Sequence, residues 1–267
     1  MLTPDEITEL TSFAGTLADA AAKVTLPHFR SGLSVDNKRG QFTFDPVTAA
    51  DRDAETAIRE LISQNYPTHG IYGEEYGRVI GTSDNYWVID PIDGTRSFIA
   101  GVPLWGTLIA LNDGTKPVIG VMDQPYTGER FIGHPGGSEL ASRQGRIKLK
   151  TSTCTTLQDA LFANTDPAMF QKDVERAAFD EISAKVKLRR FSGDCYFYAL
   201  LAAGTIDLIV ESSLQPYDIQ AMIPIIENAG GIVTDWAGSD PQMGGNVVAA
   251  ATPELHQAAL AILSQAL

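Results

Sequence analysis

The chain has 267 residues, 44% hydrophobic and 20% charged, which suits a globular protein with a sizeable buried core. Its 33 acidic and 20 basic residues give a net charge of −13, and such an acidic balance argues against binding of nucleic acid or of an anionic membrane. Only two cysteines are present, without a C-x-x-C pair, which disfavours a disulfide framework and a structural zinc site. Because no basic region precedes an apolar core at the N-terminus, and no apolar stretch approaches ~20 residues, we expect a cytoplasmic protein.

The first half predicts two helices followed by a run of strands. Thr3 and Pro4 are typical of a helix start, and apolar residues then recur at helical spacing to about residue 29. Thr48 precedes a second amphipathic helix over 49–65. Between the two helices we expect a hairpin of strands 33–38 and 41–44. The residues that follow predict a loop at 82–85, a loop at 133–137, and strands at 71–75, 87–89, 104–111, 118–123 and 130–132. The last three strands are expected to form an antiparallel meander.

The second half changes to alternating strands and helices. We expect strands at 161–164, 186–190, 207–210, 232–234 and 247–250, and helices at 167–184, 193–203, 217–229 and 253–263. Alternation of this kind predicts a layered α/β unit, whereas the first half is α+β. We therefore divide the chain into subdomains 1–145 and 146–267.

The motif W-V-I-D-P-I-D-G-T at 87–95 is the most informative stretch of the chain. Asp90 and Asp93 follow a buried strand on a tight turn, where Gly94 permits an unusual backbone and Thr95 suits the N-cap of a short helix. Two carboxylates on such a turn repel each other, so a cation is expected between them, and Mg²⁺ prefers oxygen ligands. The free amides at the helix start suit a phosphate. The structural alternative is an Asx-type turn, in which the aspartates only cap backbone amides.

Four other acidic residues lie at strand ends or helix starts. Asp51 and Asp218 are in the first turns of predicted helices, and Glu74 and Glu211 end predicted strands. Each position has an ordinary explanation as a cap, a partner of the helix dipole or a solvated side chain. Together they suggest one site, because α/β sheets bind ligands at the carboxyl ends of their strands.

The motifs G-E-E (73–75), W-V-I-D-P-I-D-G-T (87–95) and P-Y-D-I-Q-A (216–221) resemble the inositol monophosphatase family, Mg²⁺-dependent and lithium-sensitive phosphatases. D-P-V-T-A-A-D (45–51) matches that family's upstream acidic motif. The resemblance implies an α-β-α-β-α sandwich of the inositol monophosphatase and fructose-1,6-bisphosphatase type, usually a homodimer. One departure is Tyr217, where the family usually has Trp. The implied metal ligands are Glu74, Asp90, Asp93, Asp218 and the carbonyl of Ile92.

The resemblance also implies a mechanism of phosphomonoester hydrolysis. Roughly two or three Mg²⁺ ions would activate a water, neutralise the phosphate and stabilise the leaving alkoxide. Asp51 would lie just behind the ligands, while Glu74 and Thr95 would orient the attacking water and relay its proton. No phosphoenzyme is needed. The implied contacts to substrate at the central motif are Asp93, Gly94 and Thr95.

The second half carries the residues expected to choose the alcohol. After Arg190 and Gly193, where the general family has a small neutral residue, this chain has Asp194. Together with Glu211 it suits a cationic alcohol, because a buried pair of carboxylates without a cation is costly. The stretch resembles the histidinol-phosphate phosphatase branch of the family, which acts in histidine biosynthesis. The alternatives are that Asp194 only N-caps its helix, and that the protein is an inositol or sugar monophosphatase or a non-catalytic metal and phosphate sensor.

Overall fold

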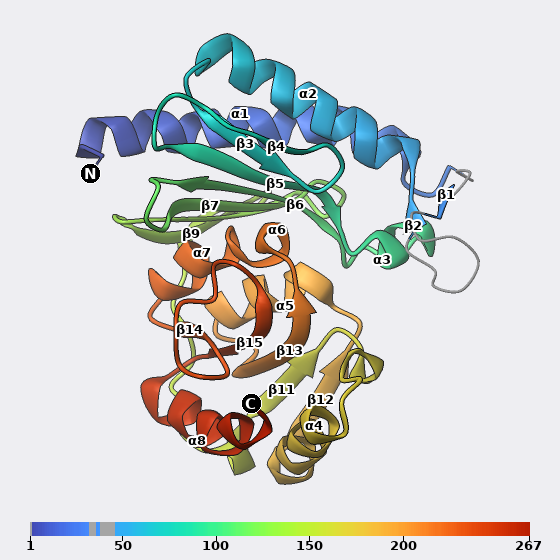
Figure 1. Cartoon of the computed structure of the whole chain (residues 1–267), viewed down its shortest axis with the longest axis vertical. Coiled ribbons are helices and arrows are strands. Elements are labelled where there is room, and N and C mark those ends of the chain that lie inside the picture. The colour runs from blue at the N-terminus through green and yellow to red at the C-terminus, as the bar shows by residue number, and fades with distance from the viewer. Residues whose placement is uncertain (1, 32–35, 38–45) are drawn as a thin grey trace.

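The computed structural model describes residues 2–31, 36–37 and 46–267, arranged in five layers in the order α-β-α-β-α (Figure 1). This order confirms the expected α/β sandwich. Long helices cover the outer face of the larger sheet, short helices fill the space between the two sheets, and further helices cover the outer face of the smaller sheet (Figure 1). No helix in the described part of the chain is long and apolar enough to cross a membrane.

The first layer consists of α1 (Pro4–His28) and α2 (Ala49–Asn65), both at their predicted positions. Each begins with a capping box, in which the N-cap threonine and an acidic residue three positions later satisfy each other's backbone N–H groups. Their apolar faces pack on the sheet in one core cluster with Trp87 and Ile109. Of the expected hairpin, only 36–37 falls within the described residues, as β1 (Asp36–Asn37), and the expected second strand 41–44 lies outside them. The strand β1 pairs with β2 (Pro46–Val47), which was not predicted.

The larger sheet has eight strands in the order β10-β9-β8-β7-β6-β5-β3-β4. Among the described strands of this sheet, β3 and β5 form the one parallel pair, and the predicted antiparallel meander is confirmed. The expected loop at 133–137 is wrong, because β8 continues to His134 and β9 begins at Gly137. The strands are β3 (Gly70–Gly73), β4 (Gly77–Val79), β5 (Tyr86–Asp93), β6 (Gly106–Asn112), β7 (Pro117–Gln124), β8 (Glu129–His134), β9 (Gly137–Ser142) and β10 (Gly145–Lys148).

The smaller sheet has five strands in the order β12-β11-β13-β15-β14. The strand β11 pairs in parallel with its neighbours β12 and β13. The strand β15 pairs antiparallel with its neighbours β13 and β14. The strands are β11 (Leu161–Asn164), β12 (Leu188–Phe191), β13 (Leu208–Leu214), β14 (Ile232–Asp235) and β15 (Gly245–Ala250). The predicted subdomain boundary at 145 falls at the start of β10, and the division itself stays a prediction.

The helices of the second half lie in the middle and outer layers. The middle layer holds α5 (Asp194–Ala202), α6 (Pro216–Ile219) and α7 (Met222–Glu227), and it is buried against both sheets. The outer layer holds α4 (Asp173–Lys185) and α8 (Pro253–Leu263). Single 3₁₀ turns are present at Leu157–Asp159, Pro167–Met169 and Ser264–Ala266.

Two of the predicted helices are interrupted, each for a local reason. The expected helix 217–229 is split into α6 and α7, because Pro224 has no N–H to donate to the carbonyl of Gln220. The expected helix 167–184 begins instead as a 3₁₀ turn, and the chain then leaves helical geometry at Phe170. The ring of Phe170 is buried and stacks on Phe179 and Trp236, which fixes the break.

Candidate active site

The central turn is built by the end of β5 and the start of α3 (Thr95–Ile99). The strand runs on to Asp93 and is irregular between Asp90 and Asp93. Gly94 is the N-cap of α3 and has φ +81°; a Cβ there would lie 3.1 Å from a carboxylate oxygen of Asp194. The prediction that Thr95 is the N-cap is therefore wrong. Its hydroxyl instead donates to the carbonyl of Ile92 at 3.1 Å, and that carbonyl keeps a second lone pair.

Three aspartates from the two halves of the chain meet at this turn. Asp90, Asp93 and Asp218 each offer an oxygen, and the three oxygens lie within 4.8 Å of one another. Asp218 is held at the start of α6, where it accepts a hydrogen bond from the backbone N–H of Gln215 at 2.7 Å. Asp93 likewise accepts from the N–H of Cys195 at 2.7 Å, so backbone donors aim both side chains.

The electrostatics of this cluster favour a bound cation. Burial raises the pKa of Asp93 to about 6, and burial together with neighbouring carboxylates raises the pKa values of Asp90 and Asp218 well above the ordinary range. The charged forms are therefore costly unless a positive charge lies between them. The donors are all carboxylate oxygens, which fit a hard divalent cation such as Mg²⁺ and do not suit a soft metal.

Glu74 and Asp51 lie next to this cluster. Glu74 follows β3, and its backbone N–H donates to the carbonyl of Ile89 at 3.1 Å, beside the strand that carries Asp90. Its charge contributes to the raised pKa values of Asp90 and Asp51. Asp51 is buried in α2, and one of its oxygens accepts from the N–H and the hydroxyl of Thr48 at 2.8 and 2.6 Å. Asp51 is thus a cap of α2 that also lies within reach of the charge of Glu74.

A cavity of about 310 Å³ opens beside the aspartates and holds most of the predicted substrate contacts. Its walls come from the turn after β5, from α5 and from β13. A wider depression, of about 960 Å³, lies between α1 and the strands β8 and β9, and it contains none of the predicted site residues. Of the predicted substrate contacts, those that line the smaller cavity are Asp93, Gly94, Thr95, Asp194 and Glu211.

The carboxylates of Asp194 and Glu211 are both held in this cavity. Asp194 accepts a hydrogen bond from the hydroxyl of Ser97 at 3.0 Å, and burial raises its pKa to about 7. Glu211 accepts from the backbone N–H of Thr165 at 2.7 Å, and burial raises its pKa to about 8. The N-cap of α5 is Gly193 rather than Asp194, so the alternative that Asp194 only caps its helix is wrong. Asp194 has φ +44°, an uncommon backbone for a residue with a side chain.

Arg190 and Gly193 do not line the cavity. Arg190 is exposed on β12, the edge strand of the smaller sheet. Gly193 is buried, and a Cβ there would lie 2.2 Å from the ring of Phe197, so its lack of a side chain is needed for packing. Their contact with substrate stays a prediction.

The cavity also includes residues that sequence reasoning missed. Thr165 and Tyr198 line it, and the hydroxyl of Tyr198 is buried without a hydrogen-bond partner anywhere in the described part of the chain. One signal could have found Tyr198, because it follows Asp194 by four residues and so shares its face of α5. Thr165 carries no such signal, since its contact with Glu211 depends on the pairing of β11 with β13.

Comparison with known proteins identifies the family. The sequence profile of the inositol monophosphatase family matches residues 6–267. The bifunctional phosphatase IMPL2 of Arabidopsis thaliana is 43% identical, and the match covers 96% of this chain and 77% of IMPL2. The histidinol-phosphatase of Streptomyces coelicolor is 35% identical, and that match covers 98% of this chain and 99% of the relative. A solved inositol monophosphatase from Zymomonas mobilis has a TM-score of 0.84 at 39% identity over 96% of this chain and 98% of its own. The chain therefore belongs to the inositol monophosphatase family and is a phosphatase.

Proposed function

We propose that the protein hydrolyses L-histidinol phosphate to L-histidinol and phosphate, with Mg²⁺ as its cofactor. One observation carries the proposal: two buried carboxylates, Asp194 and Glu211, line the cavity that opens beside the three clustered aspartates. A neutral polyol offers no charge to either group. Histidinol carries an ammonium and an imidazole, which can pair with both. The name of the Streptomyces coelicolor relative supports this substrate, whereas that of the Zymomonas mobilis structure supports an inositol phosphate.

The ligands of the cation would be Glu74, Asp90, Asp93, Asp218 and the carbonyl of Ile92. When bound, Mg²⁺ lowers the pKa of water, neutralises phosphate oxygens and stabilises the leaving alkoxide. Glu74 accepts the proton of the attacking water, and the Thr95 hydroxyl orients that water, while its hydrogen bond to Ile92 fixes the hydroxyl in place. Asp51 would lie behind Glu74, whose charge helps to raise the pKa of Asp51.

The substrate contacts of the cavity are of two kinds. Gly94 and Thr95, at the aspartate turn, would contact the phosphate. Asp194 and Glu211 would face the alcohol, and both groups give up their protons on binding a cation, because a positive partner lowers the pKa of a carboxyl. Tyr198 adds a neutral donor beside them, which can serve an acceptor nitrogen of an imidazole.

Three further parts of the proposal concern the protein as a whole. Lithium should inhibit, because a monovalent cation in place of Mg²⁺ stabilises an alkoxide less well. A homodimer is the assembly that the family resemblance implies. Both cysteines are free, which fits a reducing compartment such as the cytoplasm.

A turnover assay tests the proposal. Phosphate release should be measured from histidinol phosphate, inositol 1-phosphate and glycerol phosphate, each with and without Mg²⁺. We expect Mg²⁺-dependent release, fastest by kcat/KM from histidinol phosphate. A preference for inositol 1-phosphate would contradict the substrate assignment, and release that is independent of Mg²⁺ would contradict the cofactor.

A further inference from the structure

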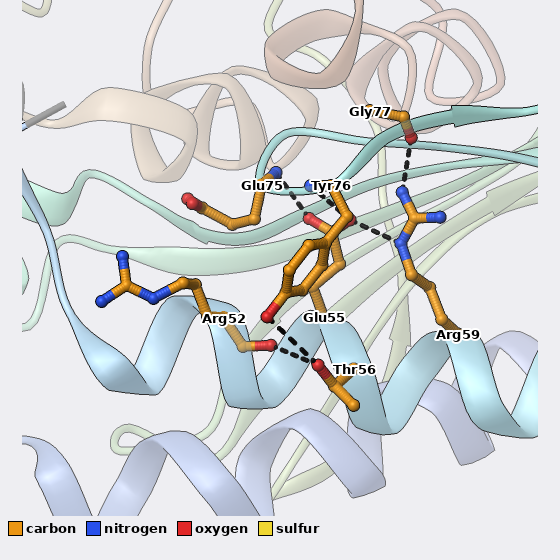
Figure 2. Close-up of polar contacts among 7 residues, drawn as sticks. All are labelled: Arg52, Glu55, Thr56, Arg59, Glu75, Tyr76 and Gly77. Atoms are coloured by element: carbon orange, nitrogen blue, oxygen red, sulfur yellow. Dashed lines mark hydrogen bonds and ion pairs between the residues drawn. The ribbon is translucent and has the colours of Figure 1, made fainter. Parts of the chain in front are cut away.

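A fully buried carboxylate holds the turn that carries Glu74. Glu55 in α2 has no exposed surface, and it accepts hydrogen bonds from the backbone N–H groups of Glu75 at 2.7 Å and of Tyr76 at 3.2 Å (Figure 2). The Nε–H of Arg59, one helical turn further along α2, donates to the same carboxylate at 2.6 Å. The guanidinium of Arg59 also donates to the carbonyl of Gly77. One ion pair on α2 therefore binds three successive residues after Glu74.

The residue before Glu74 is a glycine, Gly73, which leaves room for the Glu55 carboxylate. A Cβ at Gly73 would lie 2.0 Å from an oxygen of Glu55, so any side chain there would displace it. Glu74 itself is tied on its other side, where its N–H donates to the carbonyl of Ile89. The backbone of Glu74 is thus held between β5 and the Glu55 carboxylate.

A second acidic residue of α2, Asp51, also lies near Glu74. Asp51 and Glu55 are four residues apart on α2, so they lie on one helix face and project toward the same part of the sheet. Asp51 faces the charge of Glu74, while Glu55 holds the backbone that follows it. Neither Glu55 nor Arg59 lines the cavity beside the aspartates, so neither can touch a substrate there.

We infer that Glu55 is a positioning residue: through the amides of Glu75 and Tyr76 it fixes the Glu74 carboxylate at the aspartate cluster before the cation binds. Holding a ligand in place in advance lowers the ordering cost of binding, so the effect is expected on the affinity for Mg²⁺ rather than on the chemical step. Partners that orient metal ligands typically change affinity by about 10–100-fold when they are removed. The inference rests on the proposed role of Glu74 as a metal ligand.

The test measures Mg²⁺ binding to the metal-free protein by calorimetry, and kcat at saturating Mg²⁺. The variant Glu55→Gln replaces one acceptor oxygen by an NH₂ group, which must then face a backbone N–H or Arg59. We expect its dissociation constant for Mg²⁺ to rise at least about tenfold, while kcat at saturating Mg²⁺ stays within about twofold. Amide exchange at Glu75 and Tyr76 should become faster in the same variant, because their acceptor is weakened.

Two variants make the test specific. Ile58→Val, in the buried face of the same helix, lowers stability without touching the turn, and it should leave Mg²⁺ affinity unchanged. Arg59→Lys keeps the charge but lacks the planar fork through which two nitrogens of Arg59 reach Glu55 and Gly77. It should therefore raise the dissociation constant by a smaller factor, and it serves if Glu55→Gln fails to fold.

The outcomes separate this inference from the proposed function. Unchanged Mg²⁺ affinity in the folded Glu55→Gln protein, or in Arg59→Lys if the first does not fold, would overturn the positioning role. If Glu55→Gln weakens Mg²⁺ binding only as much as Ile58→Val does, the positioning role would be overturned too, since Glu55 would then matter only to stability. Glu74→Gln is measured in parallel: if it binds Mg²⁺ as tightly as the native protein, the assignment of Glu74 as a ligand fails, whatever the result at Glu55.

Discussion

The hydroxyl of Ser97 donates a hydrogen bond of 3.0 Å to the carboxylate of Asp194, although the two residues are 97 positions apart in the sequence. Ser97 lies in α3, directly after the aspartate turn, and Asp194 lies at the start of α5 in the middle layer. The bond therefore joins the short helix that directly follows the predicted metal ligands of β5 to the helix that carries the predicted specificity residue. Asp194 lines the cavity, and Gly193 rather than Asp194 is the N-cap of α5.

Replacement of Asp93 by asparagine should abolish turnover while the fold is kept. The side-chain oxygen of the new amide can still accept from the N–H of Cys195, but the charge that faces the cation is lost. Mutation of a residue that only orients a metal ligand typically lowers metal affinity or activity by about 10–100-fold. Loss of the charge of a ligand itself should therefore lower kcat/KM by more than about a hundredfold. The measurement is phosphate release over a range of Mg²⁺, with circular dichroism to check the fold. Near-native activity at low Mg²⁺ would mean that Asp93 is not a ligand.

The raised pKa of Glu211 predicts how stability depends on pH. In the folded protein this pKa is raised to about 8, against an ordinary value of 4.5. The folded state therefore binds the proton more tightly than the unfolded chain, so the stabilising contribution is complete below the ordinary pKa and is lost as the pH rises through about 8. Glu211→Gln keeps an acceptor for the N–H of Thr165 but cannot ionise.

Urea unfolding without divalent cations, at about pH 5 and about pH 8.5, measures this effect. We expect the native protein and Glu211→Gln to be similar in free energy of unfolding at the lower pH, and the variant to be more stable at the higher pH. A difference between them that does not change with pH would show that Glu211 titrates at its ordinary value.

Tyr198→Phe should stabilise the protein and weaken substrate binding. The Tyr198 hydroxyl is buried without a partner among the described residues, and an unsatisfied buried group of this kind costs about 1–3 kcal/mol. Its removal should therefore raise the free energy of unfolding. If the hydroxyl donates to bound substrate, the KM for histidinol phosphate should rise roughly threefold to tenfold.

Tyr196→Phe, on the same helix, is the matched control. The Tyr196 hydroxyl donates to Glu129 at 2.6 Å, away from the cavity, so its removal should lower stability and leave KM unchanged. If Tyr198→Phe and Tyr196→Phe have the same KM for histidinol phosphate, the hydroxyl of Tyr198 does not reach the substrate.

The sequence predicts those parts of the site whose residues are close to one another along the chain. The motif at 87–95 predicts that Asp90 and Asp93 act together, although the structure has both residues in the end of β5 rather than on a turn after it. The alternation of predicted strands and helices also indicates that further carboxylates lie at strand ends. Long-range contacts are not predictable in this way, because they depend on how strands pair. The contact of Thr165 with Glu211 spans 46 residues and follows from the position of β11 beside β13.

The fold was predicted less completely where hydrophobic patterning is weak. The strand β10 is exposed at every residue, and β9 carries several polar side chains, so neither produces a clear alternation. Glu55 shows the opposite difficulty. A charged residue on an amphipathic helix is normally solvated, and its burial here is caused by a turn of another element, which supplies N–H donors.

Asp194→Ser tests most directly whether Asp194 selects a cationic alcohol. The measurement is the ratio of kcat/KM for histidinol phosphate to kcat/KM for glycerol phosphate, in the native protein and in the variant. Truncating one partner of a buried charge pair costs ~2–5 kcal/mol, so we expect the ratio to fall by at least about thirtyfold while glycerol phosphate turnover changes little. An equal loss on both substrates would make Asp194 a structural residue, and no loss on either would contradict the histidinol phosphate assignment.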